Sequence, residues 1–268
     1  MNFNLEANRC NITNKELNNK VKEITNLYLE ETLKRNKVAF YYEDINNNIL
    51  SFNKDICFYA ASTIKILVCL IILEQAEDNL INLEEKILIK MQDLKQDTGI
   101  IKYQKKDTYY TIRKLIELTI TESDNTAYLK LVDLIGKENI KAYGLKLGAE
   151  HTMEGKETDS FGIINCKDMI IYWKKVKEYI DSNNRFSKEF KEYLLHPTTK
   201  FIKNDSIDNQ KFIRKYGSWD IAYHEAGYIE SKNYYFIIIL TQLNKFNYKE
   251  DFINKSAKIL NEINKQIS

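Results

Sequence analysis

The spacing of apolar residues changes along the chain and divides it into three blocks. Near the N-terminus, apolar residues recur with a helical period and predict an amphipathic helix over residues 14–35. Two short segments rich in aromatic and β-branched residues follow, at 38–42 and 49–53, and predict a pair of strands. Helical spacing then dominates as far as residue 195, and strand-like spacing returns after it.

The later blocks complete the expected order of elements. The helices expected in the middle block cover residues 62–79, 112–119, 126–135, 167–180 and 187–195. The strands expected afterwards cover residues 211–215, 221–228 and 234–243, and a closing helix follows them. Strands at both chain ends with helices between them favour an α/β (α+β) fold. In it, an antiparallel sheet is flanked by the N- and C-terminal helices and carries an inserted all-helical lobe.

The length and composition fit one globular domain. We expect it to span residues 1–268, with an α/β lobe of residues 1–60 and 200–268 and a helical lobe of residues 61–199. The 40 basic and 38 acidic residues give a net charge of +2, so no nucleic-acid partner is expected. The longest apolar run, residues 66–73, is too short to span a membrane. The expected compartment is cytoplasmic as the sequence is written, or extracytoplasmic if a leader precedes it, and the oligomeric state is left open.

The cysteines and histidines do not suggest a metal site. The cysteines are Cys10, Cys57, Cys69 and Cys166. They lack the spacing of zinc ligands, so we predict no metal and no cofactor, and we expect buried thiols in place of a disulfide framework. The histidines, which show no triad arrangement and are expected to be structural or surface residues, are His151, His196 and His224.

A serine and a lysine stand one helical turn apart at the start of the helix expected over residues 62–79. Ser62 and Lys65 have the i, i+3 spacing that places two side chains on one helix face. The apolar residues after Lys65 are expected to desolvate it, which favours a neutral amine able to accept the serine proton. The same spacing occurs at Ser51 and Lys54, but there the predicted structure is a strand and the geometry fails.

A polar turn separates two of the apolar helical segments. It contains Ser123, Asp124 and Asn125, and all three residue types cap helices well, so a helix cap is one interpretation. In a functional interpretation, Ser123 relays a proton to a departing nitrogen and Asn125 hydrogen-bonds a substrate amide. The two interpretations are compatible, because a turn between helices is a rigid place to aim a hydroxyl.

Together the two motifs resemble the signature of the class A β-lactamases and penicillin-recognising serine hydrolases. The similarity extends over segments 58–65 and 115–127, and the expected order of helices and strands is also that of the family. The resemblance therefore covers nearly the whole chain. It implies a β-lactamase/transpeptidase-like fold with the active site between the lobes, Ser62 as the nucleophile, Lys65 as the base and Ser123 as the proton relay.

The family's third motif, K-T-G or K-S-G, is altered in this chain. The best match is Lys215-Tyr216-Gly217, and a second K-x-G match, Lys146-Leu147-Gly148, lies in the helical block. The resemblance implies that Asn125, Lys215, Tyr216 and Gly217 bind substrate, with Lys215 attracting its carboxylate. It also implies an oxyanion hole made by the amides of Ser62 and Ser218. Tyr216 departs from the family because a bulky phenol replaces a small hydroxyl.

A second departure concerns release of the acyl group. Family β-lactamases carry an E-x-x-L-N motif whose glutamate activates water, and residues 149–164 lack it. Glu154 and Glu157 are candidate replacements, and a solvated charged loop is the alternative. The family's disulfide is also expected to be absent, because Ile116 stands where a partner for Cys69 is required.

We therefore expect a serine hydrolase that is acylated at Ser62 by a small-molecule β-lactam or a peptidoglycan-like amide. The first alternative is a D-Ala-D-Ala peptidase or esterase that turns β-lactams over poorly. Acylation without a placed base for deacylation is how penicillin-binding proteins behave. The second alternative is a non-catalytic binding or sensor module, in which Tyr216 or Trp219 prevents a productive oxyanion hole.

Overall fold

The computed structural model describes residues 5–6, 19, 37–156, 160–244 and 246–267. Apart from residue 19, the helix expected over residues 14–35 lies outside the described residues, as do Cys10 and Glu157. In the described part of the chain, no helix is long and apolar enough to cross a membrane.

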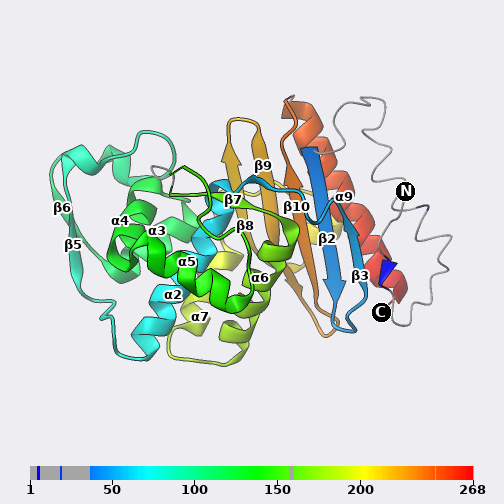
Figure 1. The fold of residues 1–268 in the computed structure, drawn as a ribbon, viewed down its shortest axis with the longest axis horizontal. Coiled ribbons are helices and arrows are strands. Elements are labelled where there is room, and N and C mark those ends of the chain that lie inside the picture. Colours follow the sequence, from blue (N-terminus) through cyan, green and yellow to red (C-terminus); the bar gives the residue numbers. More distant parts are fainter. Residues whose placement is uncertain (1–4, 7–18, 20–36, 157–159, 245, 268) are drawn as a thin grey trace.

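Strands from both ends of the chain form one antiparallel sheet of six strands (Figure 1). Its order is β1–β3–β2–β10–β9–β8. The strands are β1 (Leu5–Glu6), β2 (Val38–Asp44), β3 (Ile49–Phe52), β8 (Lys211–Trp219), β9 (Ala222–Glu230) and β10 (Tyr235–Thr241). β2 pairs with β10 in a register that sets Val38 opposite Thr241. An antiparallel sheet built from both chain ends is what the sequence predicts, whereas the edge strand β1 is not among the predicted strands.

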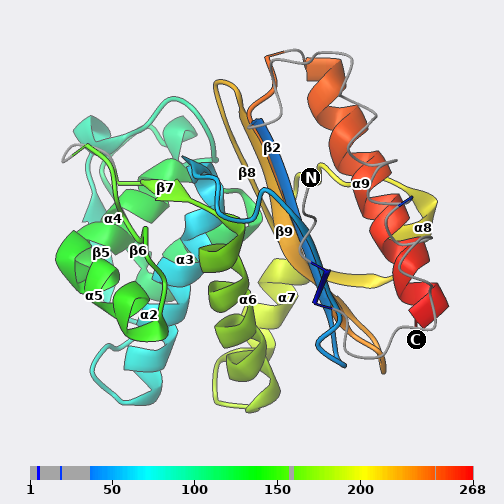
Figure 2. The ribbon, with the colours of Figure 1, turned by 45° about the vertical axis from the view of Figure 1, so that its right-hand side comes forward.

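Both faces of the sheet are buried, which explains the long apolar runs of its strands. In β10, Ile237 and Ile239 pack into a cluster beneath the C-terminal helix α9 (Phe246–Ile267), whereas Ile238 and Leu240 pack into the larger cluster of the helical side. Successive side chains of a strand point to opposite faces, so one apolar strand serves two cores. Figure 2 shows α9 on one side of the sheet and the other long helices on the opposite side.

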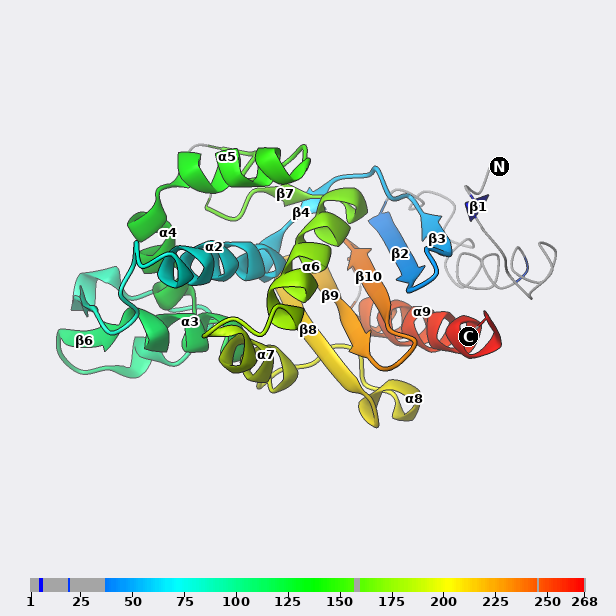
Figure 3. The ribbon, with the colours of Figure 1, turned by 90° about the horizontal axis from the view of Figure 1, so that it is seen from below.

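The helical lobe is built around α2 (Figure 3). Its α-helices are α2 (Lys65–Glu77), α3 (Ile112–Thr121), α4 (Asn125–Ile135), α5 (Lys137–Leu147), α6 (Cys166–Asp181) and α7 (Ser187–Leu195). α2 is buried almost all round, as expected of a helix without a polar stripe. Asn165 caps α6 by accepting the amide of Asp168. The proposed boundaries between the lobes stay a prediction.

Several short elements were not predicted from the sequence. They are β4 (Phe58–Tyr59) with β7 (Ile163–Ile164), β5 (Lys86–Ile89) with β6 (Thr108–Thr111), the 3₁₀ helices η2 (Ala61–Ile64), η3 (Met91–Asp93) and η4 (Ile101–Tyr103), and α8 (Asp205–Asp208). β8 also extends beyond the predicted end at residue 215, because pairing with β9 continues to Trp219 opposite Ala222.

The cysteines differ in part from the expectation. Cys69 and Cys166 are buried free thiols, but Cys57 is exposed, so the prediction of a buried thiol is wrong there. Cys57 precedes the short strand β4, whose edge lies at the surface and whose burial begins only at Phe58.

Candidate active site

The motif that contains Ser62 and Lys65 spans the junction between η2 and α2. Ser62 lies in η2 and accepts the backbone amide of Lys65, the first residue of α2. Ala61, which precedes Ser62, has a φ of 47°, a left-handed conformation that costs a residue with a Cβ about 1–2 kcal/mol. Strained backbone of this kind is often found where a side chain must be aimed, and here it presents the Ser62 hydroxyl to a pocket.

Lys65 is fully buried and joins the two sequence motifs. Its Nζ donates to the backbone oxygen of Ser123 at 2.6 Å and to Asn125 Oδ1 at 2.5 Å, and it lies 3.2 Å from Ser123 Oγ. The centroids of the Tyr128 and Phe161 rings lie 5.4 and 5.8 Å from Nζ and 5.0 Å from each other. Lys65 therefore connects the two sequence motifs in the structure.

Burial determines the protonation of this lysine. Removal from water lowers the pKa of Lys65 well below its ordinary value, and the positive charge of Lys215 lowers it further, whereas Asp124 and Asp97 act in the opposite direction. Burial also lowers the pKa of Lys215 to about 7, offset in part by Glu225. A neutral Lys65 amine has a lone pair, which is what a general base requires.

The Ser123–Asn125 turn is held by its middle residue. Ser123 has a left-handed φ of 52°. Asp124 caps α4 by accepting the amide of Ala127, and its other carboxylate oxygen accepts the amides of Ile100 and Ile101. One buried carboxylate therefore fixes the start of α4 and the preceding loop together. The helix cap and the functional interpretation are both compatible with this geometry.

The altered third motif lies within β8 and faces the nucleophile segment. A Cβ on Gly217 would lie 2.8 Å from the amide nitrogen of Thr63 and 3.0 Å from that of Ser62, so only glycine permits this approach. Ser218 follows and lines the same pocket as Ser62. The structure thus brings together Ser62, Gly217 and Ser218, the residues expected around an oxyanion hole.

Lys215 and Tyr216, which the resemblance assigns to substrate binding, pack against each other in the structure. Lys215 is fully buried, donates to the backbone oxygen of Tyr216 and lies 4.0 Å from the centroid of the Tyr216 ring. Burial raises the pKa of Tyr216, while hydrogen bonds with the side chains of Thr199 and Ser123 lower it. The phenol therefore contacts the proposed proton relay and covers the lysine beside it.

Replacing Gly217 with alanine is expected to lower the acylation rate at least tenfold and to destabilise the fold by about 1–3 kcal/mol. The added methyl group would meet backbone atoms of the nucleophile segment, which cannot move aside without shifting Ser62. Intact-mass kinetics with a penicillin and a thermal melt measure the two effects. Gly148→Ala is the control. It also adds a methyl group to a glycine, at a left-handed position, but no atom lies within 4 Å of the new Cβ, so acylation should be preserved. Wild-type acylation in Gly217→Ala would contradict the role of close approach.

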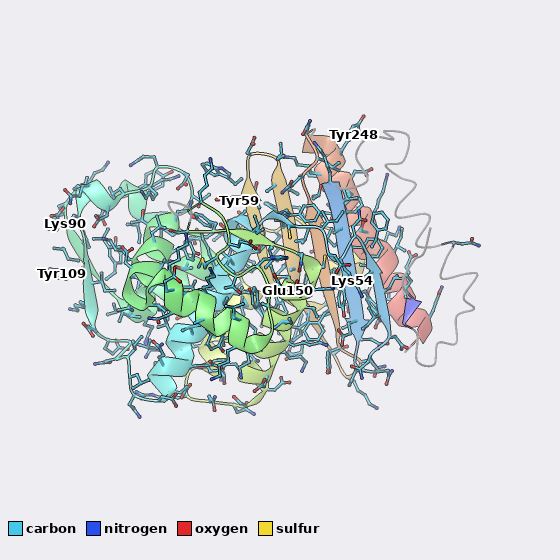
Figure 4. The ribbon with its side chains drawn as sticks, viewed as in Figure 1. Lys54, Tyr59, Lys90, Tyr109, Glu150 and Tyr248 are labelled. Atoms are coloured by element: carbon cyan, nitrogen blue, oxygen red, sulfur yellow. The ribbon has the colours of Figure 1, made fainter. Side chains whose placement is uncertain are left out.

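A pocket of about 400 Å³, part of it open to solvent, lies in front of Ser62. Its lining residues are Tyr59, Ala61, Ser62, Asp97, Asn125, Phe161, Ser218 and Trp219. Figure 4 labels Tyr59 where the helices meet the sheet, which is where the site was expected. Asp97 and Phe161 were not predicted from the sequence. The polar stretch around Asp97 signals a turn, but nothing in it indicates a position beside Asn125.

Glu154, one of the two candidate bases for deacylation, is not among the described residues that line this pocket. Glu154 is about half exposed, and its Oε2 lies 2.7 Å from His151 Nδ1. Glu157 lies outside the described residues, so its role stays a prediction. The other S-x-x-K match begins in β3 and ends just after it, and Lys146-Leu147-Gly148 lies at the C-terminal end of α5. Neither match belongs to an element that carries a residue of the candidate site.

His224 is a buried residue that supports the nucleophile segment. Its Nδ1 accepts the amide of Thr241, so Nε2 carries the proton and donates to the backbone oxygen of Tyr59 at 2.9 Å. Burial lowers the pKa of His224 to about 4, while its hydrogen bonds to backbone raise it slightly. The neutral ring therefore ties β4 to the sheet just before Ser62.

His224 is expected to make the protein acid-sensitive. Below pH 6.5 the His224 imidazole binds a proton in the unfolded chain but stays neutral in the folded protein. The free energy of unfolding therefore falls as the pH drops from 6.5 towards about 4. The loss attributable to this group is about 3 kcal/mol. Urea denaturation between pH 4 and 7 measures it, and His224→Gln, which does not titrate, should flatten the profile. An unchanged profile in this variant would assign the sensitivity to other groups.

A family model described as "Beta-lactamase enzyme family" matches residues 17–264 of the chain. The chain belongs to this family. Beta-lactamase BRO-1 of Moraxella catarrhalis is 29% identical over 272 residues, covering 94% of this chain and 84% of that protein. The family is one of β-lactamase-like serine hydrolases, in agreement with the resemblance seen in the sequence.

Solved structures show the same fold at low sequence identity. PBP-A is 17% identical, with a TM-score of 0.78 over 90% of this chain and 96% of that chain. The TLA-3 extended-spectrum β-lactamase is 19% identical, with a TM-score of 0.78 over 92% and 98% of the two chains. The β-lactamase/transpeptidase-like fold predicted from the sequence is therefore confirmed.

Proposed function

We propose that the protein is a serine hydrolase in which Ser62 attacks a β-lactam or related amide and becomes acylated. The observation that carries the proposal is the position of Lys65, whose Nζ binds Ser123 Oγ and Asn125 Oδ1 while fully buried. This contact joins residues of two separate motifs beside the pocket that Ser62 lines.

The proposed acylation step uses residues of these motifs in sequence. The neutral Lys65 amine accepts the Ser62 proton as Oγ attacks the carbonyl carbon, and the amides of Ser62 and Ser218 stabilise the negative oxygen that develops. Ser123 then passes a proton to the departing nitrogen as the C–N bond breaks. Protonated Lys65, whose Nζ lies 3.2 Å from Ser123 Oγ, replaces the proton that Ser123 gives up. The product is an ester of Ser62, and the lowered pKa of Lys65 supports its role as the first base.

We further propose that the ester is hydrolysed slowly. Among the described residues that line the pocket, the carboxylate is that of Asp97, and its Oδ2 already accepts Asn125 Nδ2 at 2.7 Å. Phe161, which also lines the pocket and lies beside Lys65, presents a phenyl ring that cannot activate water. This favours a penicillin-binding protein of the D-Ala-D-Ala peptidase or esterase type. Rapid β-lactam hydrolysis is the second candidate, and the similarity to Beta-lactamase BRO-1 favours it.

Incubation with a penicillin, followed by intact-mass measurement, tests the proposal. We expect one adduct per chain, lost in Ser62→Ala but retained in Ser51→Ala, which removes the serine of the other S-x-x-K match. Nitrocefin separates the two candidates, because a single stoichiometric burst indicates slow release and many cycles indicate a β-lactamase. A folded wild-type protein without any adduct would instead favour the non-catalytic module.

A further inference from the structure

The charge of the pocket beside Ser62 is negative. Of the described residues that line it, Asp97 is the one with a charged side chain, and this side chain is exposed. Its position is fixed, because Oδ1 accepts the amide of Thr98 and Oδ2 accepts Asn125 Nδ2. The carboxylate therefore stands beside the carboxamide that the proposed function assigns to substrate binding.

The cations nearest this pocket are withdrawn from it. Lys65 and Lys215 are both fully buried, and Lys215 is held against the carbonyl and ring of Tyr216. Arg214 is 3% exposed, donates to the backbone oxygen of Ile202 and pairs with Glu225. None of these three lines the pocket, so among the described lining residues the negative charge of Asp97 is not offset by a cation.

The lysine closest to Asp97 in the chain is Lys95, whose exposed side chain forms no ion pair with Asp97 among the described residues. Lys102 lies further along the chain and does not neutralise the carboxylate either. Its Nζ donates to the backbone oxygen of Asp97 and lies 5.3 Å from the centroid of the Tyr103 ring. No ion pair between the two side chains occurs in the part of the chain that the structure describes. The carboxylate keeps its charge towards the pocket.

Aromatic side chains provide an independent indication of the ligand. Tyr59, Phe161 and Trp219 line the same pocket as Asp97, and Trp219 is 54% exposed. The faces of aromatic rings attract cations, and a desolvated ammonium over such a ring gains about 2 kcal/mol. A carboxylate together with aromatic faces is the chemistry that recognises a protonated amine.

We infer that the pocket selects amide or lactam substrates that carry a protonated amine, and that Asp97 is the residue that determines this specificity. The inference rests on the proposed function and adds the substrate class to it. The amine is expected to bind near Asn125, on the acyl side of the bond that Ser62 attacks.

Penicillins that differ at one substituent test the inference. The probes are an α-aminobenzyl penicillin, an α-carboxybenzyl penicillin and unsubstituted benzylpenicillin, compared by their second-order acylation rate constants. We expect the amino compound to react about three- to tenfold faster than benzylpenicillin and the carboxy compound to react more slowly, with both differences shrinking at high salt. Equal rates, or faster reaction of the carboxy compound, would overturn the inference.

Matched variants assign the effect to Asp97. In Asp97→Asn the ratio between the amino and carboxy compounds should fall towards one, whereas Asp133→Asn, which removes an exposed acid from α4, should keep the wild-type ratio. An unchanged ratio in Asp97→Asn overturns the assignment. The measure is the ratio of the two rate constants within each variant. Absolute rates are expected to change in Asp97→Asn for a second reason, because Asp97 also accepts a hydrogen bond from Asn125.

Equilibrium binding to Ser62→Ala distinguishes this inference from the proposed function. If the wild type forms no adduct but Ser62→Ala binds the amino compound more tightly, then acylation is wrong and the specificity stands. Equal binding of the amino and carboxy compounds to Ser62→Ala contradicts the specificity, whatever the acylation result.

Discussion

Replacing Lys65 with methionine is expected to slow acylation of Ser62 by about 10²- to 10⁴-fold, the usual contribution of a positioned general base. Methionine fills a similar volume beside the rings of Tyr128 and Phe161, so the packing should survive. It removes the Lys65 donor from Asn125 Oδ1, at a cost of about 1–3 kcal/mol in the free energy of unfolding, whereas the backbone oxygen of Ser123 keeps the hydrogen bond from the Thr98 hydroxyl. Stopped-flow measurement with a fluorescent penicillin gives the rate.

Lys54→Met is the matched control for this variant. Lys54 stands in the other S-x-x-K match, just after β3, and its loss should leave the acylation rate unchanged. Thermal melts of both variants separate slow chemistry from unfolding. If folded Lys65→Met reacted at the wild-type rate, another group would have to accept the Ser62 proton.

Replacing Phe161 with glutamate is expected to shorten the lifetime of the acyl-enzyme by about 10- to 10³-fold. The new carboxylate would lie in the pocket close to Lys65, where it can take a proton from an attacking water. It would also raise the pKa of Lys65 by attracting its positive charge, so acylation should become slower as release becomes faster. Intact-mass measurement of adduct decay after removal of free penicillin reports the lifetime.

Phe161→Gln separates the base from the change in packing. Both substitutions remove the ring that packs against Tyr128 at a centroid distance of 5.0 Å, so their losses of stability should be similar. Only glutamate can act as a base at neutral pH. If the two variants released the acyl group equally fast, entry of water would explain the effect in place of base catalysis.

The strands of the central sheet could be predicted because burial on both faces gives them an unmistakable composition. β10 is apolar at nearly every position, and this composition predicts a buried strand. The β5–β6 hairpin was missed because its residues are mostly exposed or half-buried, as at Tyr109, and no core imposes a pattern on them. The end of β8 was missed because Gly217 has low strand propensity, and pairing with β9 overrides it.

The site could be predicted only as far as the motifs reach. Ser62 and Lys65 are only three residues apart, so helix geometry alone predicts that their side chains lie on the same face. Asp97 and Phe161 lie on loops, and their positions depend on long-range contacts. Asp97 precedes the loop held by the Asp124 carboxylate, and Phe161 precedes the pairing of β7 with β4. No short sequence pattern encodes contacts of that kind.

The three hydrogen bonds of Asp124 have a consequence for mutational scans of this protein. Activity would vanish in most substitutions of Asp124, just as it would at its neighbours Ser123 and Asn125, although Asp124 touches no reacting atom in the proposed step. A screen that scores activity alone would therefore count it among the chemical residues. A parallel screen for soluble protein would distinguish Asp124 from the chemical residues, because its substitution disrupts the folded structure around α4 and the loop before it.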